Sequence, residues 1–197
     1  MQKIPTIFER DWNNNGKITN QMITGLSLEA LTLDKSVKAT EKLDGTNVRI
    51  TIRNYIAVRA EKRRNPDKIQ KAKGIIEPWY VDASEFDSQD KYIFDGIKNT
   101  DLSIIPDGEW SGELLGKNIQ GNPLNLDNNQ IVFFSLGQVP VFEDVPTSYE
   151  NLKEWLPKQK SKYGNNCGIE GIVWWFAGKP IGKIKVKDFL PDNRSRG

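Results

Sequence analysis

The chain of 197 residues is 37% hydrophobic and 27% charged, with a formal net charge of +2. This composition is typical of a folded globular protein and excludes an intrinsically disordered one. The sequence contains no histidine and one cysteine, Cys167, which excludes a Ser-His-Asp triad, a Cys-His pair, an intramolecular disulfide and the common zinc clusters. The chemistry that remains is that of lysine, arginine, carboxylates and hard cations.

The distribution of apolar and charged residues narrows the class of partner. No apolar run approaches the roughly 18 residues of a membrane span and the N-terminal residues lack the apolar core of a signal peptide, so we expect a cytoplasmic protein. Residues 59–73 contain seven basic and two acidic residues, and residues 179–197 contain six and two. Two basic patches on a nearly neutral chain suit a partner with localised phosphates, although charge alone fits two solvated faces equally well.

The spacing of apolar and polar residues predicts the elements in chain order. We expect a helix over 27–33, strands over 47–53 and 55–59, a helix over 84–98, a strand over 131–136, a helix over 148–156, and strands over 172–176 and 181–187. Loops rich in Gly, Asn and Pro separate them. Strands outnumber helices and no boundary divides the chain, so the prediction is one α+β domain over residues 1–197 with largely antiparallel sheets.

A lysine at a tight turn is the first chemical signal. Lys42-Leu43-Asp44-Gly45 comes immediately before the alternating strand. A lysine amine is a nucleophile only when its pKa, about 10.4 in a free side chain, is lowered by burial or nearby cations. Taken alone this string is more often an ordinary hairpin turn, because Asp-Gly is a common turn signal.

Three later strings make a chemical role for the lysine string more probable than a simple turn. Glu113 stands between glycines in GELLG, residues 112–116, and Glu170-Gly171 opens a strand. The alternation of KIKVK, residues 183–187, predicts that its three lysines share one face of a strand. Each string alone describes a surface turn or a solvent-facing edge strand. Their occurrence together and in this order is far less common.

The order K-x-D-G, G-E-L, E-G-x-V, K-x-K resembles the covalent nucleotidyltransferase superfamily of polynucleotide ligases and mRNA capping enzymes. The string EKLDGTN, residues 41–47, is most similar to ATP-dependent RNA ligases of the small single-domain subgroup, as are IPTIFER at 4–10, GELLGKNIQGNP at 112–123, EGIVW at 170–174 and KIKVKDF at 183–189. The resemblance covers nearly the whole chain. It implies an ATP-grasp-like nucleotidyltransferase (adenylation) domain, with two mainly antiparallel sheets around a nucleotide cleft and no OB-fold.

The resemblance assigns the catalytic lysines. It implies that Lys42 attacks the α-phosphorus of ATP, expels pyrophosphate and holds AMP as a phosphoramidate. Lys183 and Lys185 would neutralise charge on the α-phosphate and help to lower the pKa of the attacking amine. The alternating lysines also allow Lys185 and Lys187 as the motif pair, and the spacing to Phe189 favours Lys183 and Lys185.

The resemblance also assigns binding residues to the nucleotide, the metal and the RNA end. Glu41 would lie at the adenine edge, Asn47 at the 5′-phosphate of the acceptor strand, and Arg59 at the ribose or phosphate. Glu113 would bind the ribose or the metal, and Glu170 would bind Mg²⁺ or Mn²⁺. Phe133 would stack on the adenine, with Phe134 as the alternative, because the acidic residue that often follows this strand in relatives is missing here.

The activity implied is ATP-dependent joining of RNA 5′-phosphate and 3′-hydroxyl ends through lysyl-AMP and an adenylated 5′ end. The expected partners are ATP, RNA ends and, in the absence of an accessory domain, a possible helper protein. The basic run 59–73 is expected beside the cleft, where it carries the polynucleotide backbone or forms a solvated loop. Two other functions stay open at this point: a minimal ATP-dependent DNA nick ligase, and a non-catalytic nucleic-acid-binding relative.

Overall fold

The structure, a computed structural model, describes residues 3–23, 25, 31, 36–146 and 148–190. It divides into two compact units. The first contains Met1–Lys3 and Asp44–Val139, and the second contains Ile4–Leu43 and Pro140–Gly197. No helix in the described ranges is long and apolar enough to cross a bilayer.

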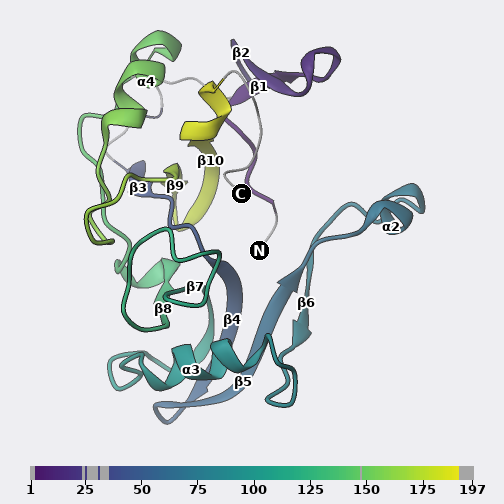
Figure 1. Ribbon diagram of the computed structural model, residues 1–197, viewed down its shortest axis with the longest axis vertical. Helices are drawn as coiled ribbons and strands as arrows, with labels where there is room; N and C mark the ends of the chain where they lie inside the picture. Colours follow the sequence, from purple (N-terminus) through teal and green to yellow (C-terminus); the bar gives the residue numbers. More distant parts are fainter. Residues whose placement is uncertain (1–2, 24, 26–30, 32–35, 147, 191–197) are drawn as a thin grey trace. The chain divides into compact units, whose positions relative to one another are not determined.

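The first unit is built on a five-stranded antiparallel sheet in the order β6-β5-β4-β7-β8 (Figure 1). Its strands are β4 (Thr46–Arg53), β5 (Ile56–Arg64), β6 (Trp79–Asp82), β7 (Gly108–Leu115) and β8 (Gln130–Phe133). The link between β4 and β5 is a two-residue turn in which Asn54 and Tyr55 both have positive φ, 50° and 63°. Such a turn matches the twist of the two strands and fixes their register.

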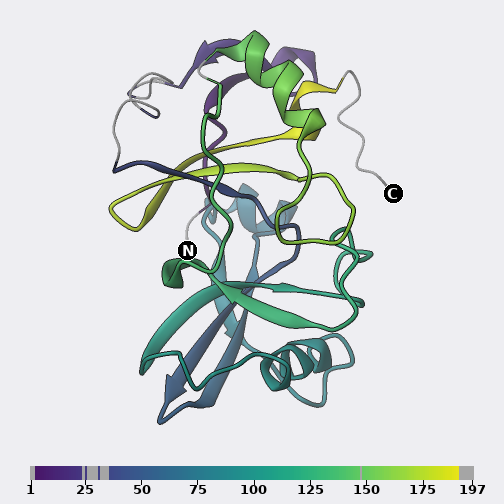
Figure 2. The ribbon, with the colours of Figure 1, turned by 90° about the vertical axis from the view of Figure 1, so that its left-hand side faces the viewer.

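One face of this sheet is covered by helix α3 (Lys91–Lys98) (Figure 2). The strands contribute buried aliphatic residues to a core that Ile93 of the helix joins: Val48, Ile50, Ile52, Ala60, Leu114, Ile131 and Phe133. Gly96 permits the close approach, since a Cβ there would lie 2.4 Å from Leu114 Cδ1. A second helix, α2 (Lys68–Ala72), follows β5 and has no buried residue. The core of this unit therefore lies on the α3 side of the sheet.

The opposite face of the sheet is polar. In the antiparallel register Arg49 of β4 pairs with Glu61 of β5 and with Ser111 of β7, and Glu61 pairs with Asp82 of β6. Paired residues and residues two apart share a face. We call this the polar face, and its members are Asn47, Arg49, Arg59, Glu61, Arg63, Tyr80, Asp82, Ser111 and Glu113.

The second unit contains a three-stranded sheet, β10-β9-β3, and a two-stranded sheet, β1-β2. The strands are β1 (Phe8–Asp11), β2 (Lys17–Met22), β3 (Lys38–Glu41), β9 (Gly171–Phe176) and β10 (Lys179–Lys185). Helix α4 (Tyr149–Trp155) begins after Ser148, whose hydroxyl accepts a hydrogen bond from Asn151 N. Its Leu152 packs with Ile172, Trp174 and Ile184 of the sheet in a second core.

Four short 3₁₀ helices complete the described elements: η1 (Trp12–Asn14), η2 (Phe134–Leu136), η3 (Leu156–Lys158) and η4 (Val186–Phe189). Two of them correct the predicted strands. The strand expected over 181–187 ends at Lys185, and the one expected over 131–136 ends at Phe133. Lys187 consequently lies in η4, so the prediction that three alternating lysines share a strand face is wrong for Lys187. The cause is Asp188, whose carboxylate accepts a hydrogen bond from Lys185 N and turns the chain.

The α+β class with antiparallel sheets is confirmed, with three sheets among the described residues in place of the two expected. The helix expected over 84–98 forms only at Lys91–Lys98, because the side chains of Ser84 and Asp87 accept backbone hydrogen bonds from Phe86 and Gln89 and hold turns. The helix expected over 27–33 lies outside the described residues apart from Leu31. The prediction of one domain over 1–197 stays a prediction.

Replacing Gly171 by alanine is expected to destabilise the second unit. A Cβ at Gly171 would lie 2.0 Å from Ile184 O, a backbone atom that cannot move away without separating β9 from β10. We expect Gly171→Ala to lower the free energy of unfolding in urea by about 2 kcal/mol or more. Gly168→Ala is the matched control, because its Cβ would meet its nearest atom, Gln159 O, at 3.7 Å. Equal stability of the two variants would contradict the tight packing at Gly171.

Candidate functional site

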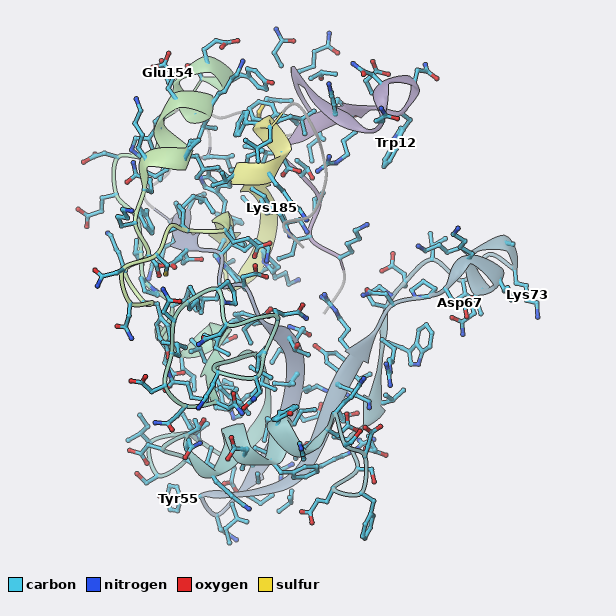
Figure 3. All side chains as sticks on the ribbon, viewed as in Figure 1. Trp12, Tyr55, Asp67, Lys73, Glu154 and Lys185 are labelled. Carbon is cyan, nitrogen blue, oxygen red and sulfur yellow. The ribbon has the colours of Figure 1, made fainter. Side chains whose placement is uncertain are left out.

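Three charged side chains meet where three strands end in the second unit. Lys42 follows β3, Glu170 precedes β9 and Lys185 closes β10. Lys42 Nζ donates to Glu170 Oε2 at 2.6 Å, and Lys185 Nζ donates to Glu170 Oε1. Figure 3 labels Lys185 at the end of its strand. We call these three residues the lysine–glutamate cluster.

The strand register explains why these side chains meet. Lys42 N donates to Gly171 O at 2.8 Å, and Gly171 pairs with Lys185. A glycine between the two lysines leaves no side chain to separate them, and Glu170 reaches both from the preceding position. Lys183 pairs with Val173 and lies two residues before Lys185, so it shares the face of Lys185.

Main-chain contacts fix β10 on its outer side. Lys183 N donates to Pro5 O and Lys183 O accepts from Ile7 N, each at 2.9 Å. The edge of the sheet is therefore paired with the segment that leads into β1. This pairing holds the strand that carries Lys183 and Lys185 in one position.

The lysine–glutamate cluster is partly buried, and its carboxylate is charged at neutral pH. The side chains of Lys42, Glu170 and Lys185 are 18%, 13% and 20% exposed. Burial raises the pKa of Glu170, but the nearby charges of Lys42 and Lys185 and their hydrogen bonds outweigh it, so that its pKa lies below the ordinary 4.5. Two ammonium groups around one carboxylate leave a net positive charge, which favours a phosphate.

Glu41 lies on the other face of the same sheet end and is buried. Its Oε1 accepts from Ser161 Oγ at 2.5 Å and its Oε2 accepts from Lys162 N at 2.9 Å. Sequence reasoning missed both partners, which lie 120 residues or more further along the chain and have no motif. These two hydrogen bonds from the loop at 161–162 fix the orientation of the Glu41 carboxylate.

A second contact that the sequence did not reveal holds the end of β10. Asp188 Oδ2 accepts from Lys185 N at 3.0 Å, and Asp188 Oδ1 accepts from Arg10 Nη2 at 2.6 Å. The only sequence signal is the three-residue spacing from Lys185 to Asp188, which is that of a helix capping pair. Arg10 of β1 thereby supports the strand end from which the Lys185 side chain starts.

Three other predicted site residues, Asn47, Arg59 and Glu113, lie in the first unit, on the polar face, and Asn47 is buried there. Asn47 and Glu113 are paired in the register of β4 and β7. Asn47 Nδ2 donates to Gly112 O at 3.3 Å, and Asn47 Oδ1 accepts from the hydroxyl of Tyr80 at 2.7 Å. Both functional groups of the Asn47 amide are thus held by the chain itself.

Arg59 is half-exposed on β5 and pairs with two carboxylates. Its Nε donates to Asp82 Oδ1 at 2.6 Å, and its Nη2 lies 3.3 Å from Glu61 Oε1. The hydrogen bond to Asp82 and the charge of Glu61 raise the pKa of Arg59, and the same hydrogen bond lowers the pKa of Asp82. Arg59 is therefore a fixed cation at the side of the polar face.

Arg49 is a polar-face residue that sequence reasoning missed. Its Nε and Nη2 donate to Glu61 at 2.6 and 2.8 Å, and its guanidinium lies 4.5 Å from the ring centre of Tyr80. The alternation of β4 gave the face of Arg49, but its pairing with Glu61 depends on a register that the sequence does not show. The network makes the polar face rigid around Asn47.

Phe133 does not present a ring to a ligand. It is 0% exposed and belongs to the aliphatic core of the first unit. A ring with no exposed face cannot stack on a base, so the expectation for Phe133 conflicts with its burial. Phe134, the alternative, is partly exposed and begins η2.

The described residues contain no group of three or more Asp, Glu, His or Cys that would enclose a metal ion. The two predicted metal ligands, Glu113 and Glu170, belong to different units. Magnesium bound with a nucleotide takes most of its ligands from phosphates and water, and one protein carboxylate is enough. Glu170 fits such an ion, provided that the ion shares its oxygens with the two lysines.

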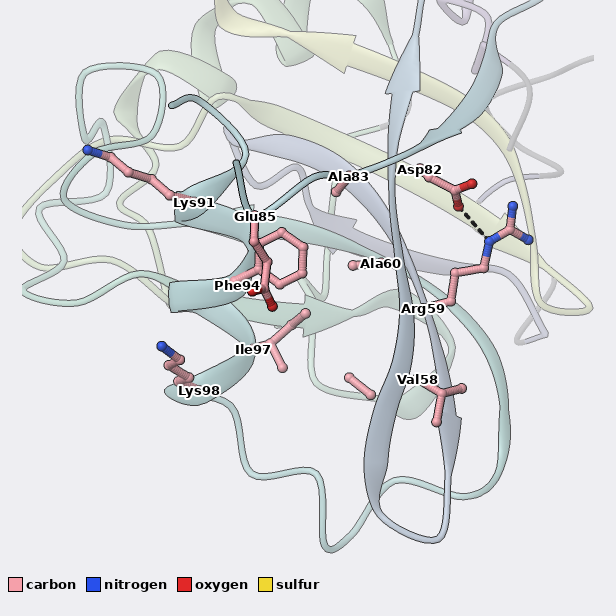
Figure 4. Close-up of a pocket in the computed structure, with 11 residues that line it drawn as sticks. Val58, Arg59, Ala60, Asp82, Ala83, Glu85, Lys91, Phe94, Ile97 and Lys98 are labelled. Carbon is pink, nitrogen blue, oxygen red and sulfur yellow. Dashed lines mark hydrogen bonds and ion pairs between the residues drawn. The ribbon is translucent and has the colours of Figure 1, made fainter. Parts of the chain in front are cut away.

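A pocket of about 660 Å³ lies in the first unit between β5, the segment after β6, and α3 (Figure 4). Its lining mixes the apolar Ala60, Phe94 and Ile97 with the charged Glu85 and Lys91. Of the predicted site residues Arg59 alone borders it, where the Arg59–Asp82 pair stands at one side. Apart from Arg59, the residues expected to bind the nucleotide therefore lie outside this pocket.

Comparison with known proteins gave no matching family model and no matching curated protein. Among solved structures, the chain is similar to mutants of an RNA ligase from Naegleria gruberi. For a ligand-free mutant the identity is 15% and the TM-score 0.46, and the match covers 94% of this chain and 60% of the ligase. For a mutant with ATP and Mn the identity is 14% and the TM-score 0.43, with 94% and 57% covered. For a mutant with AMP and Mn the identity is 13% and the TM-score 0.42, with 93% and 60% covered. Likenesses at this level support no conclusion about activity.

Removing the charge of Glu170 is expected to destabilise the protein in a pH-dependent way. Glu170→Gln leaves Lys42 and Lys185 without their counter-charge, which we expect to cost about 2–3 kcal/mol at pH 7, below the roughly 3–5 of a fully buried pair. Because the pKa of Glu170 is lower in the folded state, its contribution is complete well above pH 4.5 and is lost as pH falls through the folded value.

The measurement is the free energy of unfolding of both proteins in urea between pH 7 and pH 3. The difference between wild type and Glu170→Gln should shrink across the acid end of that range. Glu154→Gln, at an exposed glutamate of α4, is the control and should match the wild type throughout. A pH-independent difference would contradict the role assigned to the carboxylate.

Proposed function

We propose that this chain is an ATP-dependent RNA ligase that joins 5′-phosphate and 3′-hydroxyl ends through a lysyl-AMP intermediate. The observation that carries the proposal is the lysine–glutamate cluster, in which the lysine of the K-x-D-G string contacts the glutamate of E-G-x-V. Lys185 of the K-x-K string contacts the same carboxylate. Residues that are 128 positions apart in the sequence thus form one charged cluster, which is expected of residues that act in the same reaction.

In the first step Lys42 is the nucleophile. Its ammonium first releases one proton to solvent, and the neutral amine then attacks the α-phosphorus of ATP. The nitrogen–phosphorus bond forms, the bond to the pyrophosphate oxygen breaks, and the nitrogen releases a second proton to solvent as pyrophosphate leaves. Lys185 and Lys183 neutralise the charge that grows on the phosphate oxygens. The ion pair with Glu170 places Lys42 before ATP arrives, and the triphosphate then offers both lysines a second anion. This transfer depends on positioning and charge, so the absence of histidine is no obstacle.

Other residues are assigned to the adenine of ATP and to the divalent ion. We assign Glu41 to the adenine edge, since hydrogen bonds from Ser161 and Lys162 fix the orientation of its carboxylate. We assign the stacking contact to Phe134, because Phe133 is enclosed in the core. Glu170, with Glu113 as a further candidate, would hold the divalent ion, which supplies positive charge to the phosphates when bound.

The polar face takes the RNA end in this proposal. Asn47 would contact the 5′-phosphate that receives AMP, and Arg59 would bind a ribose or phosphate. Attack of a 3′-hydroxyl on the adenylated end then releases AMP and completes the joint. The chemistry of a DNA nick ligase would be the same, and the choice of strand is a matter for the substrates tested below.

Loss of the AMP adduct in a Lys42 variant is the main test. Wild-type protein, stripped of any bound AMP with pyrophosphate, should gain the mass of AMP after incubation with ATP and Mg²⁺ or Mn²⁺. Lys42→Ala should gain none, because no other amine occupies its place on the carboxylate. The measurement is intact mass. A stripped wild type that takes no AMP would overturn the proposed function and favour a nucleic-acid-binding protein without catalysis.

The lysines of the K-x-K string provide a graded test of the same step. Lys185→Ala and Lys183→Ala should slow adduct formation by about a hundredfold, the usual cost of removing a group that stabilises developing charge. Lys187→Ala should leave the rate unchanged, because Lys187 is exposed in η4, beyond the strand end. Slowing by Lys187→Ala equal to that by Lys183→Ala would move the motif pair to Lys185 and Lys187.

Matched substrates test the choice of RNA over DNA. We expect the adenylated protein to join a 5′-phosphorylated RNA to an RNA 3′-hydroxyl at least ten times faster than the DNA strands of the same sequence, measured by gel electrophoresis of labelled ends. Preference for a nicked DNA duplex would instead identify a minimal DNA ligase, with the nucleophile unchanged.

A further inference from the structure

The end of β5, the start of β6 and the segment between them form an arm that the site chemistry leaves unexplained. It covers residues 63–79, which we call the arm, and α2 lies near its tip, away from the rest of the sheet (Figures 1 and 3). None of the residues of α2 is buried. The helix is nevertheless well defined, because Asp67 and Gln70 form a capping box at its start. An ordered, exposed projection of this kind is available for contact with a partner.

The charges of the arm are uncompensated, unlike those of the sheet from which it extends. In the sheet, Arg49, Arg59 and Lys62 each form ion pairs with acidic side chains. The arm has five cations, none of which forms an ion pair with any of the residues that the structure describes. They are Arg63, Arg64, Lys68, Lys71 and Lys73. The arm contains only two acidic residues, Asp67 and Glu77, and Asp67 is occupied by its cap. Such a surplus of free positive charge matches a phosphate backbone.

The arm is continuous with the polar face of the first unit. The register of β4 and β5 pairs Val48 with Lys62. Asn47, the residue before Val48, accepts a hydrogen bond from the hydroxyl of Tyr80, and Tyr80 pairs with Arg63, the first residue of the arm. Extended chain of at most about 17 Å separates Arg63 from Lys68, which equals about five nucleotides of a stacked strand at 3.4 Å each. A strand with its 5′-phosphate at Asn47 therefore reaches α2 after a few nucleotides.

Apolar side chains at the tip indicate which form of nucleic acid fits. Ile69, Ile75 and Ile76 are 68%, 45% and 70% exposed beside the lysines of α2. A single strand offers unpaired bases with apolar faces as well as phosphates, whereas a duplex hides its bases. The mixture of isoleucine and lysine suits the single strand.

We propose that the arm binds the single-stranded RNA that follows the 5′-phosphate, with Lys68, Lys71 and Lys73 contacting its phosphates. The placement of the 5′-phosphate at Asn47 rests on the proposed function. The arm therefore contributes to the grip on long donor strands and takes no part in the reaction of Lys42 with ATP.

The test is the binding of 5′-phosphorylated single-stranded RNA to the full chain, measured by fluorescence anisotropy at several salt concentrations. The variant Lys68→Gln/Lys71→Gln/Lys73→Gln should bind a twelve-nucleotide RNA at least ten times more weakly than the wild type. The slope of log affinity against log salt should fall by about 2, since each single-strand phosphate contact contributes about 0.7. A three-nucleotide RNA, which ends before α2, should bind both proteins equally.

A matched variant controls for overall charge. Lys98→Gln/Lys153→Gln/Lys158→Gln also removes three exposed lysines, from the ends of α3, α4 and η3, and should bind RNA as the wild type does. Equal affinity and salt slope for the arm variant and the wild type would overturn the inference. AMP adduct formation without RNA should be unchanged in the arm variant. If the wild type forms no adduct, the proposed function fails, while the binding comparison still decides the role of the arm.

Discussion

The shared carboxylate of Glu170 is the interaction on which the candidate site depends. Two lysines from different strands would repel each other at this distance without it, and the burial of all three groups makes the repulsion stronger than it is in water. The carboxylate stays charged because the two lysines lower its pKa by more than burial raises it. It therefore holds Lys42 in place and leaves the lysine–glutamate cluster with a net positive charge. Gly171 makes this possible, since any side chain there would separate the strands that carry the lysines.

Each unit divides its sheet between packing and chemistry. In the first unit the α3 side of the sheet holds the aliphatic core, and the polar face carries a network in which Arg49, Glu61 and Tyr80 hold one another and Asn47. In the second unit Ile184 is in the core, while Lys183 and Lys185 lie on the other side of the same strand, β10. The strict alternation of a strand imposes this division. A side chain that binds a ligand is thereby one residue away from one that stabilises the fold.

The sequence predicted the strands and the lysines that depend on a local pattern. It did not predict the strand ends and contacts that depend on residues far along the chain. The strand that carries Lys183 and Lys185 follows from alternation, but its end at Lys185 depends on the carboxylate of Asp188, which Arg10 holds from the opposite end of the chain. The run Phe133-Phe134 indicates an aromatic contact. Which ring is buried depends on where β8 ends, and alternation cannot decide that. The partners of Glu41 and the register that pairs Arg49 with Glu61 have no local signal at all.

The separation of the cluster along the chain has a consequence for the order of folding. Lys42 and Glu170 are 128 residues apart, and β3 pairs with β9 and with the segment around Val141, both far along the chain. Contacts of such long range form late, because the entropy of closing a large loop is lost before they stabilise anything. The first unit, from Asp44 to Val139, contains local hairpins and can order earlier. In a chain still being synthesised, Lys42 therefore meets Glu170 only after residue 170 has been added, and the lysine–glutamate cluster is one of the last parts of the structure to form.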